Sequence, residues 1–225
     1  RIEGKKLKKV SNKVNILESI DISITSDTIF GLLGPNGAGK TSLFSILAGL
    51  SKPSKGEVLY DSKTVNNLSF EKRSELGVIY LPQEPSVFRE LTVEENIKAA
   101  LEAKKYEKKE IDNKFTRISE EFDLLSIKTQ KCNSLSGGQR RRVEIARAIA
   151  LNPKLILLDE PFAGIDPLII NEIKTLIKNL KEKGIGVLIS DHNVNATLDI
   201  CDYIYVINAG KVIAQGVPND IVQNE

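Results

Sequence analysis

The sequence predicts an α/β fold: a mainly parallel sheet with helices on both faces, an N-terminal antiparallel β portion and an all-helical sub-domain. Short apolar runs alternate along the chain with stretches whose apolar residues recur at helical spacing. Residues 1–30 instead show the loose apolar–polar alternation of antiparallel strands. Residues 91–125 are charged and helical, with no strand among them. These three sequence patterns correspond to the parallel core, the antiparallel β portion and the helical sub-domain.

The composition is that of an ordinary globular protein. The chain has 225 residues, enough for one large domain with a sizeable core. A net charge of +2 does not favour nucleic acid or an anionic membrane surface as a partner. The two cysteines match no metal-binding spacing, which favours a reducing cytosol. We expect no membrane span and no signal peptide, because every apolar run is short. The sequence contains no methionine, so we expect the natural chain to extend beyond it.

The N-terminal portion is expected to hold two or three short strands within residues 1–30. Its lysine-rich cluster, residues 4–9, is interpreted as a solvated strand edge, because lysines protect an unpaired edge from further pairing. The apolar run 29–33 is predicted to be a buried strand, and apolar residues recur at helical spacing from Leu43 to Leu50.

A glycine-rich string joins this strand to this helix. It fits G-x-x-x-x-G-K-[ST], the phosphate-binding loop of nucleotide-hydrolysing proteins, in which backbone N–H groups and the helix N-terminus face an anion. We expect Lys40 to reach the β- and γ-phosphates of ATP and Thr41 to hold Mg²⁺. The alternative is a glycine-rich turn that binds nothing. The predicted nucleotide contacts are Gly34, Pro35, Asn36, Gly37, Ala38, Gly39, Lys40, Thr41 and Ser42.

The rest of the chain continues the alternation of strands and helices. Thr92, followed by acids, has the residue type that caps a helix. Asp166 and Pro167 are typical of a helix start, and Gly184 is typical of a helix end. Strands are predicted at residues 57–60, 76–81, 155–158, 185–190, 203–207 and 212–214, and a last helical turn is predicted from Pro218.

Two acids, Asp159 and Glu160, close the strand at residues 155–158. In a parallel sheet the carboxyl end of a strand faces the ligand crevice, so both acids are expected beside the phosphate loop. Asp159 is predicted to hold Mg²⁺, and Glu160 to polarise the water that attacks the γ-phosphate. The alternative is a polar strand end that precedes a turn.

The string Leu-Ser-Gly-Gly-Gln at residues 135–139 opens another helix. Ser136 has the residue type of an N-cap, whereas Gly137 and Gly138 allow a phosphate to approach bare N–H groups closely. The three arginines at 140–142 point to different faces of a helix. This arrangement favours a mixture of exposed charge and internal ion pairs over nucleic-acid binding.

The order of these motifs resembles that of the ATP-binding cassette (ABC) ATPases over essentially the whole chain. The resemblance implies a P-loop NTPase cassette, with a core of residues 1–85 and 153–225 and a helical sub-domain of residues 86–152. It also implies ATP and Mg²⁺ as cofactors, and a second copy of the chain with which two ATP molecules are sandwiched head to tail. The residues that would contact ATP held by the opposite copy are Ser136, Gly137, Gly138 and Gln139.

The resemblance assigns roles to three further residues. Gln83 matches the Q-loop glutamine, which senses Mg²⁺ and the γ-phosphate and hinges the helical sub-domain. His192 matches the switch histidine, which hydrogen-bonds the γ-phosphate, and Asp166 matches the D-loop aspartate at the dimer interface. The alternatives by residue type alone are that Gln83 is a polar turn residue, His192 a structural histidine and Asp166 a helix cap.

One position departs from the family pattern. Such cassettes usually carry an aromatic residue before the phosphate loop that stacks on adenine. By spacing this position falls near Ser11, and the first aromatic residue of this chain is Phe30. We therefore expect affinity to rest on the phosphates, with weak selectivity for ATP over GTP.

Several strings narrow the resemblance to the lipopolysaccharide-export ATPases: residues 80–89, 140–147, 159–167 and 191–194. That subfamily implies a peripheral subunit at the cytoplasmic face of the inner membrane, which drives lipopolysaccharide extraction and export to the outer membrane. Two integral-membrane permease subunits would dock near residues 83–89. The apolar Val87 and Phe88 would receive a partner helix, or would pack within the helical sub-domain.

Other functions share these motifs. The nearest alternative is the ATPase of a branched-chain amino-acid importer, and an alternative of another class is a soluble ABC-type ATP clamp in DNA repair or translation. The clamp is disfavoured, because clamps of the chromosome type need a long coiled-coil insertion, for which this chain has no room. Translation-type members usually fuse two cassettes, and this sequence has one. A third alternative, a non-hydrolysing regulatory subunit, is disfavoured because Glu160 and His192 are both present.

Overall fold

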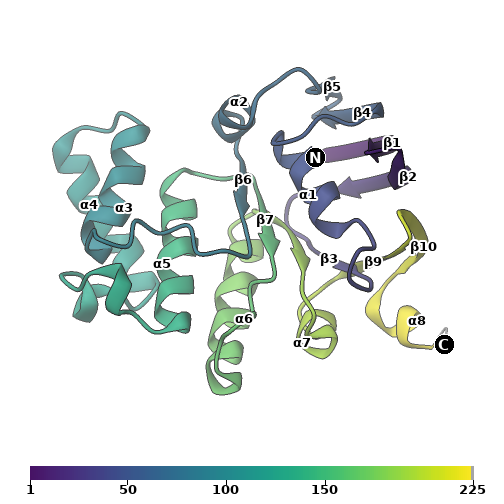
Figure 1. Ribbon diagram of the computed structural model, residues 1–225. Helices are drawn as coiled ribbons and strands as arrows, with labels where there is room; N and C mark the ends of the chain where they lie inside the picture. Colours follow the sequence, from purple (N-terminus) through teal and green to yellow (C-terminus); the bar gives the residue numbers. More distant parts are fainter. Residues whose placement is uncertain (224–225) are drawn as a thin grey trace.

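The computed structural model describes residues 1–223 and contains two β-sheets with helices packed around them (Figure 1). The larger sheet has six strands in the order β10-β9-β3-β8-β7-β6, and every neighbouring pair except β10 with β9 is parallel. The α/β prediction is therefore confirmed. The six strands are β3 (Ile29–Leu33), β6 (Val78–Leu81), β7 (Leu155–Asp159), β8 (Gly186–Ser190), β9 (Tyr203–Asn208) and β10 (Lys211–Gly216).

The central strands of this sheet are buried on both faces. All residues of β3, β7 and β8 are buried, which explains why each reads as a continuous apolar run rather than an alternating one. Because β3, β6, β7 and β8 are parallel, their carboxyl ends meet at one edge of the sheet. Predicted site residues lie one or two positions beyond these ends: Gly34 and Glu160 follow directly, and Gln83 and His192 follow after one intervening residue.

The smaller sheet has four antiparallel strands in the order β2-β1-β4-β5. Its strands are β1 (Ile2–Ser11), β2 (Val14–Ile24), β4 (Lys55–Tyr60) and β5 (Lys63–Thr64). The interpretation of residues 4–9 as a strand edge is wrong, because β1 lies between β2 and β4. Its lysines Lys5, Lys6 and Lys8 are exposed while Leu7 is fully buried, so they solvate one face of an interior strand.

The helices fall into two groups in space. In Figure 1, α3, α4 and α5 lie together on one side of the molecule, whereas α6 and α7 lie along the larger sheet. The helices are α1 (Lys40–Ala48), α2 (Phe70–Glu75), α3 (Val93–Ala103), α4 (Lys108–Glu121), α5 (Gly137–Ala150), α6 (Pro167–Glu182), α7 (Val194–Leu198) and α8 (Pro218–Val222), with short 3₁₀ helices at Leu125–Ile127 and Cys132–Ser134. Within residues 1–223, none of these helices combines the length and the apolar character that a bilayer crossing demands.

The helix starts follow the sequence prediction closely. Thr92 and Glu95 form a reciprocal capping box at the start of α3, and Asp166 accepts a hydrogen bond from the backbone N–H of Leu168 (2.8 Å) at the start of α6. Pro167 occupies the first turn of α6, where its missing N–H costs nothing. Capping depends on neighbouring residues alone, which is why it could be predicted.

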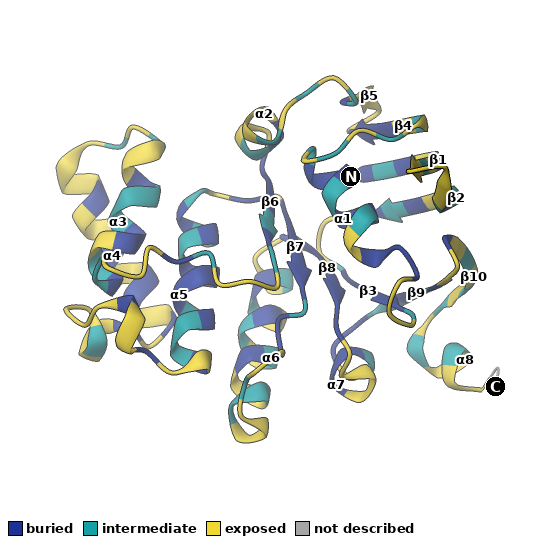
Figure 2. Cartoon of the chain, in the orientation of Figure 1, coloured by how far each residue is buried: buried dark blue, intermediate teal, exposed yellow. Residues whose placement is uncertain are grey.

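Two apolar clusters hold the molecule together. One joins the antiparallel sheet, α1 and one face of the larger sheet, and the other joins the opposite face to α3, α4, α5 and α6. Helix α1 therefore lies between the two sheets, and Figure 2 shows its buried part in dark blue. This packing fixes the helix that follows the phosphate-loop motif.

Arg73 of α2 anchors the far end of α1. Its side chain is 1% exposed, and Nη1 donates hydrogen bonds to the carbonyls of Ile46 (2.7 Å) and Leu47 (2.9 Å). Nη2 donates to the carbonyl of Val65 (2.9 Å). The last carbonyls of a helix lack helical partners, and Arg73 supplies donors for two of them. Burial also lowers the pKa of Arg73.

We predict that Arg73→Ala lowers the free energy of unfolding by about 3 kcal/mol, because it removes three hydrogen bonds from a buried side chain. The carbonyls of Ile46 and Val65 keep one backbone donor each, whereas that of Leu47 loses its donor. Arg117→Ala, at an exposed position of α4, is the control and should change it by about 0.5 kcal/mol or less. Urea denaturation followed by circular dichroism measures both values. Equal effects would show that Arg73 does not anchor α1.

Candidate nucleotide site

The phosphate-loop residues form a turn at the start of α1. Lys40 Nζ donates hydrogen bonds to the carbonyls of Gly34 (2.7 Å) and Pro35 (3.0 Å), so the loop curls around this ammonium group. A cavity of about 290 Å³ lies against the turn. Its lining consists of Ile16, Asn36, Gly37, Gly39, Lys40, Thr41, Ser42 and Glu160. The arrangement offers a lysine, a helix N-terminus and a carboxylate to one bound group.

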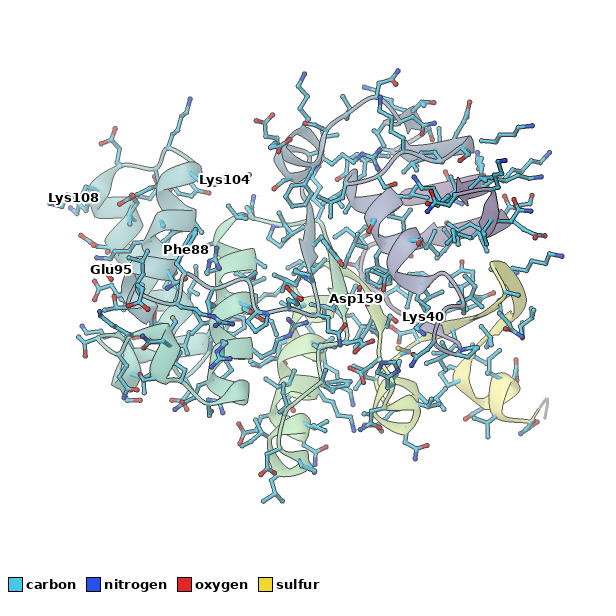
Figure 3. All side chains as sticks on the ribbon, viewed as in Figure 1. Lys40, Phe88, Glu95, Lys104, Lys108 and Asp159 are labelled. Carbon is cyan, nitrogen blue, oxygen red and sulfur yellow. The ribbon has the colours of Figure 1, made fainter. Side chains whose placement is uncertain are left out.

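Asp159 lies at the end of β7, close to Lys40 at the start of α1 (Figure 3). The carboxyl group is buried and accepts a hydrogen bond from the hydroxyl of Tyr80 (3.2 Å). Burial raises the pKa of Asp159, whereas hydrogen bonds from Tyr80 and Thr41 lower it. A buried carboxylate beside a hydroxyl group fits a hard divalent cation such as Mg²⁺.

Residues 1–223 contain no cluster of three or more His, Cys, Asp or Glu side chains that would hold a metal ion. Asp159 and Thr41 thus supply only part of a coordination shell. This donor set suits Mg²⁺, which usually keeps waters and substrate phosphates as its other ligands.

Glu160 and His192 face one another beside this cavity. His192 Nε2 lies 2.7 Å from Glu160 Oε1, and Glu160 Oε2 has no hydrogen-bond partner among the described residues. The backbone N–H of Glu160 donates to the carbonyl of Ser190 (2.6 Å), and its φ of +48° lies in the left-handed region. Such a conformation is strained for a glutamate and is typical of functional sites. One carboxylate oxygen is held by the histidine, and the other is available to accept a proton.

Asp191, which the sequence analysis did not single out, lies between these loops. It is buried, and its Oδ2 accepts a hydrogen bond from the backbone N–H of Phe162 (2.8 Å). Its Oδ1 accepts one from the backbone N–H of Asn193 (2.8 Å). The sequence offers a partial signal, because an acid two residues before Asn193 can accept its backbone N–H, but the bond to Phe162 is a tertiary contact.

Ser136 and Gln139 cap α5 by a reciprocal pair of hydrogen bonds. Ser136 Oγ accepts from the backbone N–H of Gln139 (3.2 Å), and Gln139 Oε1 accepts from that of Ser136 (3.0 Å). The glycines between them pack closely on the first turn of α6 and on the segment before it. A Cβ on Gly138 would lie 2.5 Å from Ile169, and a Cβ on Gly137 would lie 3.0 Å from the carbonyl oxygen of Gly164.

A second cavity, of about 250 Å³, lies at this helix start. Gln83, Gly137, Glu160 and Gly164 are among its lining residues. The fold therefore brings Gln83 and Gly137 to Glu160. Glu160 lines both cavities, whereas Gln83 and Gly137 do not line the phosphate-loop cavity. Asp166 caps α6 beyond Gly164.

The arginines after this helix start take part in ion pairs, as predicted. Arg141 pairs with Glu144 (2.8 Å), and both side chains are buried. Arg142 pairs with Asp123 (3.3 Å) and with Glu172 of α6. The Arg141–Glu144 pair lies within α5, whereas the Arg142 pairs join α5 to α6 and to the residue after Phe122.

The segment before α3 presents one exposed aromatic residue. Phe88 is 52% exposed, and the guanidinium group of Arg147 lies 4.7 Å from its ring centroid. Arg147 also donates to the carbonyl of Ser86 (2.6 Å). Val87 is buried in the core, which agrees with the second of the two alternatives, packing within the helical sub-domain, and not with docking of a partner helix. Figure 3 places Phe88 among α3 and α5, apart from Lys40 and Asp159.

The position expected to stack on adenine ends β1. Ser11 is exposed, and Ile16 of β2 instead lines the phosphate-loop cavity. The cavity lining on the side of the antiparallel sheet is therefore aliphatic and not aromatic.

Comparison with known proteins identifies a family. Residues 17–163 match the family described as ABC transporter. The chain is 46% identical over 211 residues to the lipopolysaccharide export system ATP-binding protein LptB of Haemophilus influenzae, an alignment that covers 93% of this chain and 88% of the relative. It is 42% identical over 225 residues to LptB of Escherichia coli strain K12, covering 100% of this chain and 93% of the relative.

Solved structures share the fold over nearly the whole chain. A nucleotide-free ATP-binding cassette from an ABC transporter superposes with a TM-score of 0.89 at 30% identity, covering 99% of this chain and 93% of that chain. The ADP conformation of another such cassette gives 0.90 at 29% identity, covering 99% and 94%. A dimeric bacterial ABC transporter cassette gives 0.85 at 27% identity, covering 97% and 99%.

We predict that Gly34→Ala weakens ATP binding by about tenfold or more, because the added Cβ would lie 2.0 Å from the carbonyl oxygen of Ile207 and would displace the loop. Gly216→Ala is the control, since it lies outside the site and a Cβ there would meet its nearest neighbour, Asp220 Cβ, only at 3.7 Å. Titration with a fluorescent ATP analogue measures both affinities. Equal affinities would mean that the loop tolerates displacement at Gly34.

Proposed function

The chain belongs to the ABC transporter family of ATP-binding cassettes, and we propose that it is the ATP-hydrolysing subunit of the transporter that exports lipopolysaccharide. The contact between Glu160 and His192, beside the phosphate-loop cavity, carries the hydrolytic part of this proposal. The similarity to LptB from two organisms carries the assignment of the cargo. In this function the energy of ATP hydrolysis drives extraction of lipopolysaccharide from the inner membrane and its export to the outer membrane.

The relatives favour this function over the alternatives. Branched-chain amino-acid importers and soluble ATP clamps share the cassette fold, so structural similarity at 27–30% identity does not separate them. The identity of 42–46% to proteins named for lipopolysaccharide export does separate them. The pairing of Glu160 with His192 also disfavours a subunit that binds ATP without hydrolysing it.

Each step of hydrolysis has a group positioned for it. The backbone N–H groups after Gly34 and the ammonium of Lys40 bind the β- and γ-phosphates of ATP. The free Oε2 of Glu160 accepts a proton from the attacking water, whose oxygen bonds to the γ-phosphorus as the bond to ADP breaks. His192 holds the other oxygen of Glu160 and donates to the γ-phosphate, and Gln83 lines the approach to them.

Mg²⁺ would be held by Thr41 and Asp159, with Gln83 near it. When bound, the ion supplies positive charge that offsets the charge developing on the phosphate oxygens. The burial of Asp159 supports this assignment, because a buried carboxylate gains from a nearby cation.

We also propose that the working unit contains a second copy of the chain. Ser136, Gly137, Gly138 and Gln139 lie outside the phosphate-loop cavity of their own chain and would contact ATP bound by the other copy. Asp166 would lie at the interface between the copies. Leu168 beside Asp166 is 82% exposed and Val194 beyond His192 is 46% exposed, so apolar surface accompanies these residues. The related dimeric cassette supports this assembly.

Residues 86–152 would move as a helical sub-domain against a core of residues 1–85 and 153–225, with Gln83 near the hinge. Two integral-membrane permease subunits would dock near residues 83–89, where Phe88 is exposed. Such partners place the chain at the cytoplasmic face of the inner membrane as a peripheral subunit. This arrangement would convert closure around ATP into movement of the membrane subunits.

We predict that Glu160→Gln keeps ATP binding but lowers the hydrolysis rate by about a hundredfold or more, because the amide cannot take the proton from water. The variant should also accumulate as an ATP-bound dimer. Phosphate release and size-exclusion chromatography with ATP measure these effects. Glu182→Gln, at an exposed position of α6, is the control. Hydrolysis at the control rate would remove Glu160 from the role of general base.

We predict that Phe88→Ala leaves ATP binding by the isolated subunit intact but weakens its assembly with membrane subunits, because it removes an exposed aromatic anchor. Affinity purification of the tagged chain from its native membrane in mild detergent, followed by mass spectrometry, measures this assembly. Leu125→Ala, at another exposed apolar position, is the control.

The same purification tests the cargo assignment. Lipopolysaccharide-export membrane subunits should accompany the wild-type chain and be depleted with Phe88→Ala. Amino-acid permease subunits would identify the importer instead, and recovery with DNA or ribosomes would exclude transport. Undiminished capture by Phe88→Ala would remove Phe88 from the docking surface.

A further inference from the structure

We propose that Asp191 is a positioning residue for ATP hydrolysis, which holds the loop after Glu160 and the loop around His192 in register with each other. The inference rests on the roles proposed above for Glu160 and His192. Asp191 acts through these residues and is not itself assigned a contact with ATP.

The carboxylate of Asp191 bridges two separate segments of the chain. Its Oδ2 accepts a hydrogen bond from the backbone N–H of Phe162 (2.8 Å), two positions after Glu160. Its Oδ1 accepts one from the backbone N–H of Asn193 (2.8 Å), the residue after His192. Each oxygen therefore serves a different loop, and a residue with only one acceptor atom cannot replace both bonds.

The burial of Asp191 makes the loss of either hydrogen bond costly. Asp191 is 6% exposed, so water cannot easily replace either hydrogen bond if one is lost. Charged acceptors form short and strong bonds to backbone N–H groups, and two such bonds fix the carboxylate in one orientation. The two loops are consequently fixed relative to each other.

Both loops need such support. Glu160 has a φ of +48°, a conformation that persists only where surrounding contacts enforce it. His192 is 53% exposed, and the helix that follows it, α7, spans only Val194–Leu198. Few packing contacts therefore hold the histidine at 2.7 Å from Glu160. The bond from Asp191 to Asn193 fixes the backbone beside His192, and the bond to Phe162 fixes the turn after Glu160.

A purely local role does not account for both bonds. The contact with Asn193 spans two residues and would by itself be a turn that helps to start α7. The contact with Phe162 joins residues 29 positions apart and adds nothing to the start of α7. It links the carboxylate to the segment that bears the proposed general base.

The test uses Asp191→Asn, which keeps the shape of the side chain but places an amide NH₂ where one backbone N–H needs an acceptor. We expect the kcat for ATP hydrolysis to fall by about tenfold or more, with the KM for ATP changed by about threefold or less, because the phosphate loop is untouched. Asp191→Ser is the second variant, should Asp191→Asn fail to fold. If neither variant folds, the carboxylate is a determinant of folding and the proposal is wrong.

Asp202→Asn is the matched control. Asp202 Oδ2 also accepts a backbone hydrogen bond, from Ile29 (2.8 Å), and Oδ1 accepts one from Lys181 Nζ (2.5 Å). These contacts lie at the start of β3, at the opposite end of the strand from the phosphate loop. The control should lose stability without a comparable loss of kcat. A larger fall in unfolding midpoint for Asp191→Asn than for the control, with normal turnover, would make Asp191 merely structural.

Multiple variants separate the two proposals. If Asp191 acts through Glu160 and His192, the triple variant Glu160→Gln/His192→Ala/Asp191→Asn should hydrolyse ATP no more slowly than Glu160→Gln/His192→Ala, since the added change removes no further effect. A further loss of about tenfold would instead show an independent role and overturn the inference. An active Glu160→Gln would contradict the proposed general base. An inactive Glu160→Gln together with an Asp191→Asn that turns over at the wild-type rate would contradict the positioning role alone.

Discussion

The backbone pairing between β7 and β8 fixes the geometry on which the rest of the site depends. Asp159 pairs with Ser190 at the carboxyl ends of these parallel strands, so the residues that follow them emerge side by side. The hydrogen bond from the Glu160 N–H to the carbonyl of Ser190 extends this pairing by one residue. A slip of one residue would turn Asp159 and its neighbours to the opposite face of the sheet. The distance from Glu160 to His192 is therefore a consequence of strand register.

In the proposed function, one chain supplies only part of each ATP site. The phosphate loop, Asp159 and Glu160 meet at one edge of the sheet, whereas the start of α5 lies across a second cavity beside Gln83. Helix α1 cannot shift to close this distance, because it is packed between two sheets and Arg73 holds its far end. A rigid phosphate loop and a separate glycine-rich helix start are what a head-to-tail pair of cassettes requires.

Several site residues perform a local structural task as well as their proposed role. Ser136 and Asp166 both cap helices in this structure, as their residue types predict. A cap aims bare backbone N–H groups outward from the start of a helix, which is also what binding of a phosphate demands. A residue such as Ser136 can therefore cap its helix and also serve the proposed ATP site.

The sequence by itself determined whatever depends on neighbouring residues: the phosphate-loop motif, the acids that end β7, the caps of α3, α5 and α6, and the α/β class. Only the tertiary structure decided which groups meet across long separations. Arg73 caps α1 from 27 residues away, and Asp191 reaches Phe162 across 29. It also placed β1 inside its sheet, buried Val87 and exposed Phe88. Periodicity specifies that a residue can face a core, but packing of distant segments decides which core it faces and which partner it contacts.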